Sequence, residues 1–420
     1  MKRVYFVLGL LMCIASAQGQ WQQVGFLGRD VECMAHHPQD TSIMLAGIVD
    51  SIFHSTDGGS SWAFICHFNG LPINCLMYDP TYYDTVYALL GDGTYSDGIY
   101  RSTDGGNNWD VLEWLYRPRD MALTRPGRIM LVGCYGPGVF KSEDEGNTWI
   151  LWNDALVDSH VHTVDYCWAP GSTLVGLAGT SQGLFYRLYT APWVQAGGIP
   201  VNLRVSSIDH SRNMQLGFAS VTGGSWSDGV YRTTDNGYTW QVVDWWIYSS
   251  AVVMNPLWQD YPNDTCGIFA GDSGLGVKYS DDCGTNWQEV NSGLGNLYIN
   301  ALSYHPQDSM LLFAATQDGL YRYEYGPGVA ENRIDDPNVS AFRVSTVHRV
   351  GRPIALISSM TGTKGLSLLV TVYDASGRLE RTEILGPRSS ALAPIYESGV
   401  YFLTVAARGV RQKEKIIVID

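Results

Sequence analysis

Five aspartates stand in register along this chain, and carboxylates at a fixed spacing are candidates for acid–base catalysis. Each belongs to an eight-residue box, Ser/Thr-x-Asp-x-Gly-x-x-Trp, that lies between two short apolar runs. In such a hairpin connection the Asp can accept hydrogen bonds from loop amides, and the Gly can adopt the positive φ that a Cβ disfavours. The Trp offers a large apolar surface to a neighbouring sheet. We therefore predict a structural role for the boxes, whose key residues are Asp57, Gly59, Trp62, Asp104, Gly106, Trp109, Asp144, Gly146, Trp149, Asp235, Gly237, Trp240, Asp282, Gly284 and Trp287.

Residues better placed for chemistry lie where the repeat is irregular. Two long loops, 91–98 and 223–229, each place an aromatic residue two positions before an Asp. The connections that follow these repeats add further candidates: Trp114, Tyr116, Arg117 and Arg119 after the first, and Trp245, Trp246 and Tyr248 after the second. Aromatic surfaces beside carboxylates and guanidinium groups suit stacking on sugar rings or gripping an extended peptide, and the alternative is that these aromatics pack the loops themselves. The predicted ligand-binding residues are Tyr95, Asp97, Trp114, Arg117, Trp226, Asp228 and Trp245.

The elements that position these loops repeat at a period of 40–47 residues. Such a period is typical of propellers, solenoids and arrays. A glycine-led or serine-led run such as Gly98-Ile-Tyr-Arg recurs seven times, but it is offset from the tryptophans: Trp21 has no such run before it, and the run at 319–322 has no Trp after it. One N-terminal strand and three C-terminal strands therefore complete one sheet, which leaves no free edge. The strand-opening tryptophans, also seven, are Trp21, Trp62, Trp109, Trp149, Trp193, Trp240 and Trp287.

The boxes resemble the Asp-box, or bacterial neuraminidase repeat, of the sialidase- and sortilin-like superfamily. The resemblance covers about residues 20–325, because the four key positions recur five times. It implies an all-β fold, a seven-bladed β-propeller closed by an N-terminal strand, with the boxes away from the active face. Ligands of such propellers usually bind where the second-to-third connections and the blade-to-blade connections meet. The fourth repeat departs from the pattern, since Leu188 and Thr190 replace the Asp and the Gly.

Both ends of the chain differ from the repeats. The basic start, the apolar run 4–14 and Ala15-Ser-Ala17 predict a secretory signal peptide over 1–19. Residues 20–328 hold 13 basic and 32 acidic side chains, a net charge of −19, whereas residues 329–420 carry +3. This change of sign predicts a propeller over 20–328, a linker over 329–339 and a second domain over 340–420.

The C-terminal region contains short β-type runs that predict a small β-sandwich. The sequences Val372-Tyr-Asp-Ala-Ser-Gly377-Arg-Leu, Ser398-Gly-Val-Tyr-Phe-Leu403 and Lys413-Glu-Lys-Ile-Ile-Val418 resemble the C-terminal sorting domain of the type IX secretion system. This resemblance implies the type IX secretion machinery as a partner and export across the outer membrane of a Gram-negative-type bacterium. The domain would then be cleaved or would attach the protein to the cell surface. A generic β-sandwich used for adhesion is the alternative.

Seven cysteines follow the predicted signal peptide, so at least one is unpaired within the chain. Cys33 with Cys75, in equivalent positions of adjacent repeats, and Cys266 with Cys283, within one repeat, are candidate bridges for an exported protein. No Cys-x-x-Cys is present, and the pair His160-x-His162 has no visible third ligand. We therefore predict no metal site.

Catalysis would require residues that the sequence does not single out. A sialidase needs three arginines around the substrate carboxylate and a Tyr/Glu nucleophile pair, but most propeller arginines occupy repeat-equivalent strand positions. A xyloglucanase-like hydrolase needs two carboxylates across a cavity. Asp154 with Asp158, or Asp97 with Asp228, are the candidates, and nothing distinguishes them from solvated loop acids. No catalytic residue is assigned.

Charge and motifs exclude other classes of function. A propeller net charge of −19 would repel phosphate and disfavours nucleic acid. No Gly-rich phosphate loop opens a helix, so no nucleotide cofactor is predicted. We expect a secreted or surface-displayed monomer that binds an extracellular polysaccharide or protein and meets a membrane only through surface attachment. A glycoside hydrolase acting on a polysaccharide and an assembly or scaffolding factor are the alternatives.

Overall fold

The computed structural model describes residues 20–324 apart from short gaps, and in the C-terminal region it describes six strands. The predicted signal peptide over 1–19 and the predicted linker over 329–339 lie outside the described residues. Every regular element of the described residues is a β-strand, so no described helix could cross a membrane. The gaps within the first region are 125–127, 170–172, 212–215, 224–226, 246–247, 256–265 and 306–307.

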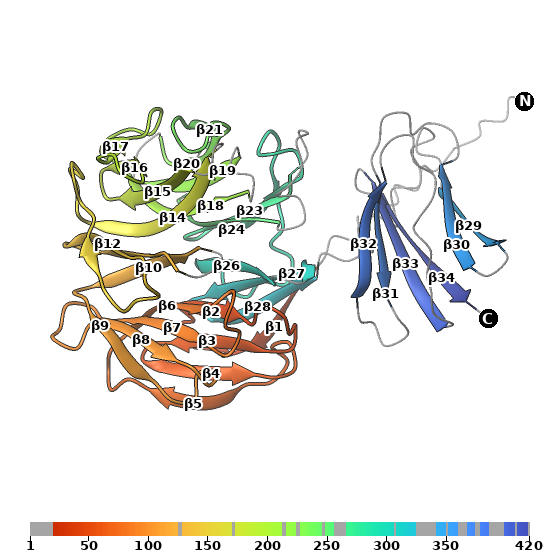
Figure 1. Cartoon of the computed structure of the whole chain (residues 1–420), viewed down its shortest axis with the longest axis horizontal. Coiled ribbons are helices and arrows are strands. Elements are labelled where there is room, and N and C mark those ends of the chain that lie inside the picture. The colour runs from red at the N-terminus through yellow and green to blue at the C-terminus, as the bar shows by residue number, and fades with distance from the viewer. Residues whose placement is uncertain are drawn as a thin grey trace, which may run out of the picture. The chain divides into compact units, whose positions relative to one another are not determined.

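Residues 20–324 form seven four-stranded antiparallel sheets arranged as the blades of a β-propeller (Figure 1). Blades 1 to 3 consist of β2 (Cys33–His36), β3 (Met44–Ile48), β4 (Ser51–Ser55), β5 (Ala63–His67); β6 (Ile73–Tyr78), β7 (Val86–Leu90), β8 (Gly98–Ser102), β9 (Asp110–Trp114); β10 (Pro118–Leu123), β11 (Met130–Cys134), β12 (Gly138–Ser142) and β13 (Ile150–Leu151). Blades 4 to 6 consist of β14 (Val161–Ala169), β15 (Thr173–Thr180), β16 (Gly183–Leu188), β17 (Val194–Gln195); β18 (Arg204–His210), β19 (Gly217–Thr222), β20 (Gly229–Thr233), β21 (Gln241–Trp245); β22 (Ser249–Met254), β23 (Ile268–Asp272), β24 (Gly276–Ser280) and β25 (Gln288–Glu289).

Blade 7 closes the ring with strands from both ends of the propeller. It consists of β26 (Ile299–His305), β27 (Asp308–Thr316), β28 (Gly319–Glu324) and the N-terminal β1 (Trp21–Gly25). In the register of β1 and β28, Trp21 lies opposite Tyr323, and the two rings are 5.0 Å apart. The predicted seven blades and their closure by an N-terminal strand are confirmed.

The second strands of blades 1, 2 and 3 are buried on both faces and are apolar along their length. β3 reads Met-Leu-Ala-Gly-Ile and β7 reads Val-Tyr-Ala-Leu-Leu, and every one of these residues is buried. Leu89 of blade 2 packs with Met121 and Val132 of blade 3, so the core is a ring of interfaces between blades. Burial of one such side chain contributes about 1.5–3 kcal/mol. Each blade is thus stabilised largely by its neighbours.

The five box loops share one hydrogen-bond pattern. In the first box, Gly59 N donates to Ser55 Oγ at 2.8 Å, and Ser55 Oγ donates to Asp57 Oδ1 at 2.8 Å. Asp57 Oδ1 also accepts from Ser61 N at 2.8 Å, and Trp62 Nε1 donates to the Gly59 carbonyl at 3.0 Å. Hydrogen bonds from the side chain and then the backbone of Ser61 lower the pKa of Asp57 to about 2. The Ser/Thr–Asp–Gly contacts recur at Asp104, Asp144, Asp235 and Asp282.

The box glycine is required both by its backbone and by its neighbours. Gly146 has a φ of +84°, and a Cβ there would lie 2.7 Å from Leu112 Cδ2. Gly237 has a φ of +83°, and its Cβ would lie 2.8 Å from Leu177 Cδ2. Both leucines belong to the preceding blade, so each box packs directly against its neighbour in the ring.

Two of the seven strand-opening tryptophans do not belong to a box. They form a hydrogen bond with the preceding blade instead. Trp193 Nε1 donates to the Trp152 carbonyl, and Trp21 Nε1 donates to the Val290 carbonyl, each at 2.5 Å. The degenerate fourth repeat and the N-terminal strand therefore keep the Trp contact after losing the Asp and the Gly.

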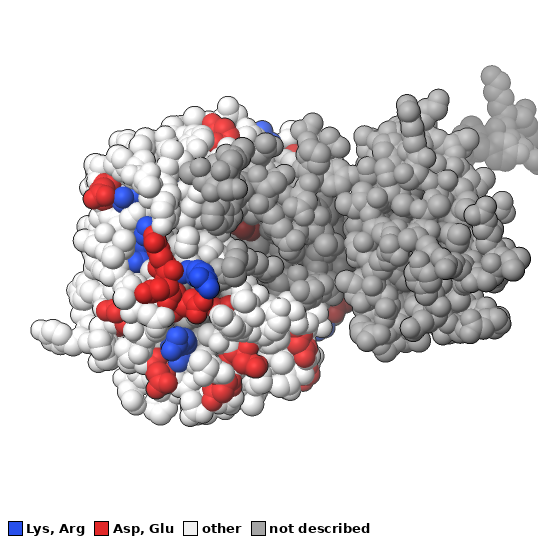
Figure 2. All heavy atoms as spheres, in the orientation of Figure 1, with Lys and Arg blue, Asp and Glu red and all other residues white. Residues whose placement is uncertain are grey.

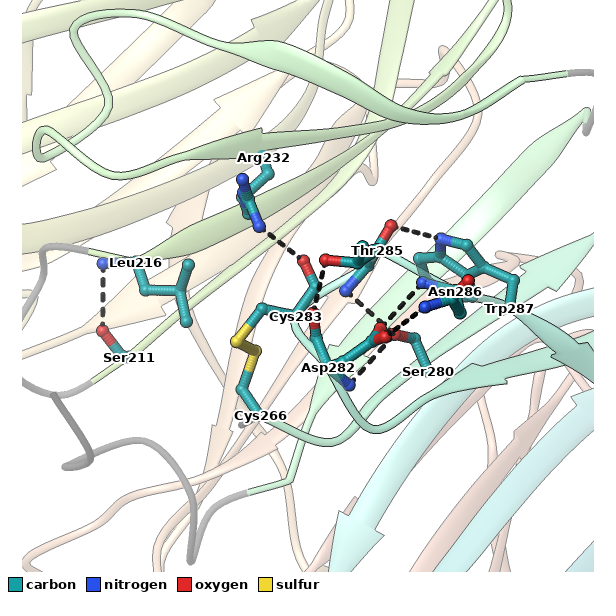
Figure 3. The surroundings of a disulfide bond; sticks show 11 residues. Ser211, Leu216, Arg232, Cys266, Ser280, Asp282, Cys283, Thr285, Asn286 and Trp287 are labelled. Carbon is teal, nitrogen blue, oxygen red and sulfur yellow. Dashed lines mark hydrogen bonds between the residues drawn. A yellow bond between two sulfur atoms is a disulfide. The ribbon is translucent and has the colours of Figure 1, made fainter. Parts of the chain in front are cut away.

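A disulfide joins Cys266 to Cys283 within blade 6 (Figure 3). Cys283 is part of the fifth box, and its carbonyl accepts a hydrogen bond from Arg232 Nη1 of blade 5 at 2.9 Å. Cys33 and Cys75, the other predicted pair, are free thiols. The bridge ties a box loop to the segment that enters β23 of the same blade.

The C-terminal strands form a unit separate from Gln20–Glu324. β29 (Phe342–Arg349) pairs with β30 (Arg352–Ser359). Whether the two sheets of this unit pack as the predicted sandwich stays a prediction, as does the sorting role. The second sheet has the order β32 (Leu379–Leu385), β31 (Leu368–Tyr373), β33 (Gly399–Ala407) and β34 (Val410–Val418).

Candidate functional site

The two ends of the blades carry different connections. Because each blade is an antiparallel meander, the box connections and the first-to-second connections emerge at one end. The second-to-third connections and the blade-to-blade connections emerge at the other end, which we call the loop face. The predicted ligand-binding residues that the structure describes lie on loop-face connections or at strand ends that reach them.

Blade 2 presents an exposed aromatic group at the loop face. Tyr95, at the tip of the connection between β7 and β8, is fully exposed, Trp114 at the end of β9 is 55 % exposed, and Tyr116 is 50 % exposed. The ring of Tyr100 lies edge-on to Trp114, with centroids 6.2 Å apart. Large apolar side chains gathered in contact with water mark interaction surfaces. The predicted residues Tyr95, Asp97, Trp114 and Arg117 therefore belong to one region.

Asp97 does not face solvent, although a ligand contact was predicted for it. The residue is 2 % exposed, and its Oδ2 accepts hydrogen bonds from Gly93 N at 2.7 Å and Arg117 N at 3.0 Å. Its Oδ1 accepts from the N and Oγ1 of Thr94 at 3.0 and 2.8 Å. A carboxylate bonded in this way organises the loop. It also holds Arg117 at a φ of +50°, which aims the following strand.

The second predicted group lies in blade 5, on another part of the ring. Asp228 is buried, and Trp245 at the end of β21 is 47 % exposed. Trp226 lies outside the described residues. Blades 3 and 4 separate this group from blade 2 on one side, and blades 6, 7 and 1 separate it on the other. Asp97 and Asp228 therefore belong to separate groups, and both carboxylates are buried.

The other candidate carboxylates are already engaged. Asp154 Oδ2 pairs with Arg187 Nη2 at 2.8 Å. Asp158 is buried, and its Oδ1 lies 2.8 Å from His160 Nδ1. This contact orients the exposed imidazole of His160, whereas the Asp158 carboxylate itself is buried.

A ring of seven residues surrounds the propeller axis at the loop face. In six blades a β-bulge interrupts the start of the innermost strand, and the pairing register skips one residue there. Glu32 takes the same place in blade 1, directly before Cys33. Bulges re-aim side chains and recur beside active sites. We call these half-buried residues the axial ring: Glu32, Asn74, Arg119, His162, Ser206, Ser250 and Asn300.

The axial ring meets a cluster centred on Tyr135, in the connection between β11 and β12. The guanidinium carbons of Arg117 and Arg119 lie 5.8 and 5.9 Å from the Tyr135 ring centroid. The rings of His160 and His162 lie 4.6 and 5.4 Å from it. This cluster can donate hydrogen bonds to a hydroxylated or anionic ligand from several directions.

Charges of both signs lie near the axial ring. Figure 2 shows basic side chains close to acidic ones around the middle of the propeller face in view, with much uncharged surface elsewhere on that face. Burial, and then Asp30, raise the pKa of Glu32 to about 7, although Arg119 lowers it. Burial, and then Arg204 and Arg119, lower the pKa of His162 to about 4. At neutral pH the imidazole is therefore uncharged, and Glu32 is close to its midpoint.

One residue further along the innermost strand of blade 3, a half-buried carboxylate joins neighbouring blades. Asp120 Oδ2 accepts hydrogen bonds from Thr163 Oγ1 at 2.8 Å and Val164 N at 3.0 Å, and burial raises the pKa of Asp120 to about 6. Within the described residues, no group of three or more His, Cys, Asp or Glu side chains is placed to hold a metal ion.

Sequence reasoning named Arg119 and His162 but did not predict that they meet at Tyr135, which it did not single out. The signal present was the innermost-strand pattern, in which one polar residue stands between an aliphatic and a small residue, as in Val31-Glu-Cys33 and Ile73-Asn-Cys75. In blades 3 and 4 the flanking residues differ, so the equivalent positions could be aligned only once the strand registers were known.

No protein-family model matches the chain, and no curated protein matches it. Among solved structures, YCF48 bound to a D1 peptide is 15% identical, with a TM-score of 0.52 over 73% of this chain and 96% of that chain. A GH74 xyloglucanase from Xanthomonas campestris is 14% identical, with a TM-score of 0.57 over 93% and 66%. The extracellular domain of a putative hybrid two-component system from B. thetaiotaomicron is 16% identical, with a TM-score of 0.57 over 95% and 47%. At these identities the likeness establishes the fold alone, an all-β protein built on a seven-bladed β-propeller.

Proposed function

We propose that this protein is an exported binding module whose loop face holds an extracellular polysaccharide. The observation that carries the proposal is the exposed aromatic group of blade 2, Tyr95, Trp114 and Tyr116, beside the polar axial ring. Flat aromatic surfaces cover the apolar faces of sugar rings, and the hydroxyl groups at the ring edges need donors and acceptors next to them.

These residues form a row that runs from the rim of blade 2 toward the axis. Trp114 ends the outermost strand β9, and Tyr116 follows it. The guanidinium of Arg117 lies 5.7 Å from the Tyr116 ring centroid and 5.8 Å from that of Tyr135, which Arg119 also approaches. A row that alternates aromatic and basic side chains suits a linear ligand with several sugar units better than a single small molecule.

Export supports the same proposal. The signal peptide predicted over 1–19 and the resemblance of residues 340–420 to a type IX sorting domain predict a propeller outside a Gram-negative-type cell. One structural neighbour is named a xyloglucanase and another an extracellular domain, which is consistent with a polysaccharide met outside the cell.

Glycoside hydrolysis is the second candidate, favoured by one observation. Glu32 is a carboxyl of the axial ring whose pKa burial raises to about 7, as an acid catalyst requires. Hydrolysis would need a second carboxylate across the ligand. A protein ligand and a scaffolding role form the third candidate, because one neighbour is named as bound to a peptide.

Isothermal titration of the mature chain against a panel of soluble polysaccharides and extended peptides separates these candidates. The same mixtures are assayed for released reducing ends. Polysaccharide binding without release supports the binding module. Release that is lost in Glu32→Gln identifies a hydrolase, and binding of peptides with no glycan contradicts the proposal.

A further inference from the structure

Four members of the axial ring connect neighbouring blades by hydrogen bonds. Each donates a hydrogen bond to the carbonyl that directly precedes the ring residue of the next blade. In these four blades the axial-ring residue therefore has a structural role, and the side chain that performs it is a short uncharged hydrogen-bond donor. The bonds run from Asn74 to Pro118 at 2.8 Å, from Ser206 to Ser249 at 3.1 Å, from Ser250 to Ile299 at 2.6 Å and from Asn300 to Val31 at 2.9 Å.

The remaining three members, Glu32, Arg119 and His162, depart from this pattern. Glu32 as a carboxylate cannot donate, and in blade 1 the Cys33 thiol approaches the Ile73 carbonyl at 3.7 Å in its place. His162 Nε2 lies 2.8 Å from Ser181 Oγ within its own blade. In the other four blades this position holds an uncharged donor that bonds to the next blade. The presence of an ionisable side chain in these three blades is therefore not explained by contacts between blades.

Arg119 retains donors that the structure does not use. One of its N–H groups donates to Asn74 Oδ1 at 3.0 Å. In the described part of the chain its guanidinium forms no other hydrogen bond and no ion pair. A guanidinium carries five N–H donors in a planar fork, which matches the two oxygens of a carboxylate.

Some basic residues of the propeller are paired with nearby carboxylates. Lys141, Arg187 and Lys278 pair with Glu143, Asp154 and Asp244 at 2.6, 2.8 and 2.9 Å. Arg119 and Arg204 are among the arginines that form no such pair within the described residues, although the propeller sequence is strongly acidic. Both act on the pKa of His162, so their positive charges converge on one side of the ring. An acidic molecule with locally unpaired cations attracts anions at that place and repels them elsewhere.

We propose that the axial ring binds the carboxylate of an acidic sugar, so that the ligand is a uronate-containing polysaccharide; this rests on the function proposed above. Arg119 contacts the carboxylate and Arg204 adds positive charge beside it. Tyr116 and Trp114 hold the neighbouring sugar units of the same chain. A sulfated polysaccharide offers a different anion, and the planar fork of Arg119 suits it less well.

The test titrates the mature chain with uronate oligosaccharides, with the same oligosaccharides after reduction of their carboxyl groups, and with a sulfated neutral glycan. We expect the uronate form to bind at least tenfold more tightly than its reduced form. Arg119→Gln should lose about 10- to 100-fold in affinity for the uronate form, the effect of one charge-assisted hydrogen-bonded contact, and keep the affinity for the reduced form. Arg101→Gln, on β8 and outside the ring, is the matched control and should bind like the wild type.

Equal binding of the uronate and reduced forms would overturn this inference and leave the polysaccharide proposal standing. Tighter binding of the sulfated glycan would overturn it as well. If no glycan binds, both proposals fail. Arg204→Gln is the second variant, should Arg119→Gln not fold, and must also reduce the preference for the uronate form.

Discussion

Glu32 is the residue whose charge state is expected to control the axial ring. Burial and Asp30 raise its pKa to about 7, and Arg119 partly offsets this effect. The ionised form places a negative charge near Arg119, where it opposes an anionic ligand. The neutral form leaves the guanidinium free to attract one. The ring thus couples ligand charge to pH near neutrality.

Affinity for a uronate oligosaccharide should fall by about tenfold, or about 1.4 kcal/mol, between pH 6 and pH 8. Glu32→Gln should keep the low-pH affinity at both values, because the amide cannot ionise. Isothermal titration at pH 6, 7 and 8 measures the change. An affinity of the wild type that does not depend on pH, or an unchanged pH dependence in Glu32→Gln, would contradict this role.

The buried side chains of His36 in blade 1 and His305 in blade 7 are expected to lower the stability of the protein in acid. The rings of His36 and His305 lie 5.2 Å apart. Burial, and then His305, lower the pKa of His36 to about 3, and burial lowers that of His305 to about 4. An unfolded imidazole has a pKa of about 6.5. Below that pH these histidines bind protons in the unfolded chain but not in the folded chain. The free energy of unfolding is therefore at its full value above pH 6.5 and falls as the pH drops.

The free energy of unfolding should therefore decrease by about 2 kcal/mol for each of these histidines between pH 7 and pH 5. Urea denaturation at both pH values measures the decrease. His36→Leu should reduce the change in the free energy of unfolding between the two pH values by about 2 kcal/mol. His67→Leu, at an exposed position, is the control and should not reduce this change. Equal pH dependence in wild type and His36→Leu would refute the assignment.

At the scale of elements, the box loops and the bulges serve different purposes. A box fixes a hairpin through its own hydrogen bonds, and its glycine fits against the preceding blade. A bulge at the start of an innermost strand presents one side chain to the axis without disturbing the sheet behind it. Glu32, Arg119 and His162 can therefore differ from the other members of the axial ring while the boxes keep the same conformation.

Asp282→Ala should lower the free energy of unfolding by about 1–2 kcal/mol, because it removes acceptors for Asn286 N and Ser280 Oγ. Asp281→Ala, one residue earlier in the same loop and exposed, is the matched control and should have little effect. Thermal and urea denaturation measure both variants. Ligand affinity should be unchanged in each, since the boxes lie at the end of the blades opposite the loop face. A loss of binding with intact stability would instead assign the box a direct role.

At the scale of the whole molecule, β1 makes the ring complete. Trp21 is 2 % exposed, and its indole packs on Tyr323 and bonds to blade 6. Trp21→Ala should cost about 3–5 kcal/mol, the range for a large buried aromatic side chain. Trp114→Ala, at a 55 % exposed position, should leave the unfolding midpoint nearly unchanged. Similar midpoints for the two variants would mean that closure contributes little to stability.

The fold could be predicted from the sequence because its determinants are local and repeated. Each box is a self-contained hairpin, and the offset between Trp21 and the run at 319–322 already implied closure. The candidate binding region could be predicted from the sequence only in part. Tyr95 and Trp114 are exposed at the loop face as expected, but Asp97 turned out to be buried in its loop. The axial ring could not be predicted, because a bulge and its contacts across blades are properties of the assembled ring.

Binding of a polysaccharide by the blade 2 aromatic group can be tested with one variant of that group and one matched control. Trp114→Ala and Tyr82→Ala remove aromatic side chains that are 55 % and 54 % exposed, the first at the loop face and the second in the connection between β6 and β7 at the opposite end. The measurement is the affinity of each variant for the tightest-binding polysaccharide, beside its unfolding midpoint. We predict that Trp114→Ala loses at least tenfold in affinity, that Tyr82→Ala binds like the wild type, and that neither midpoint moves. Equal affinities for the two variants, or a loss in Tyr82→Ala alone, would contradict the account.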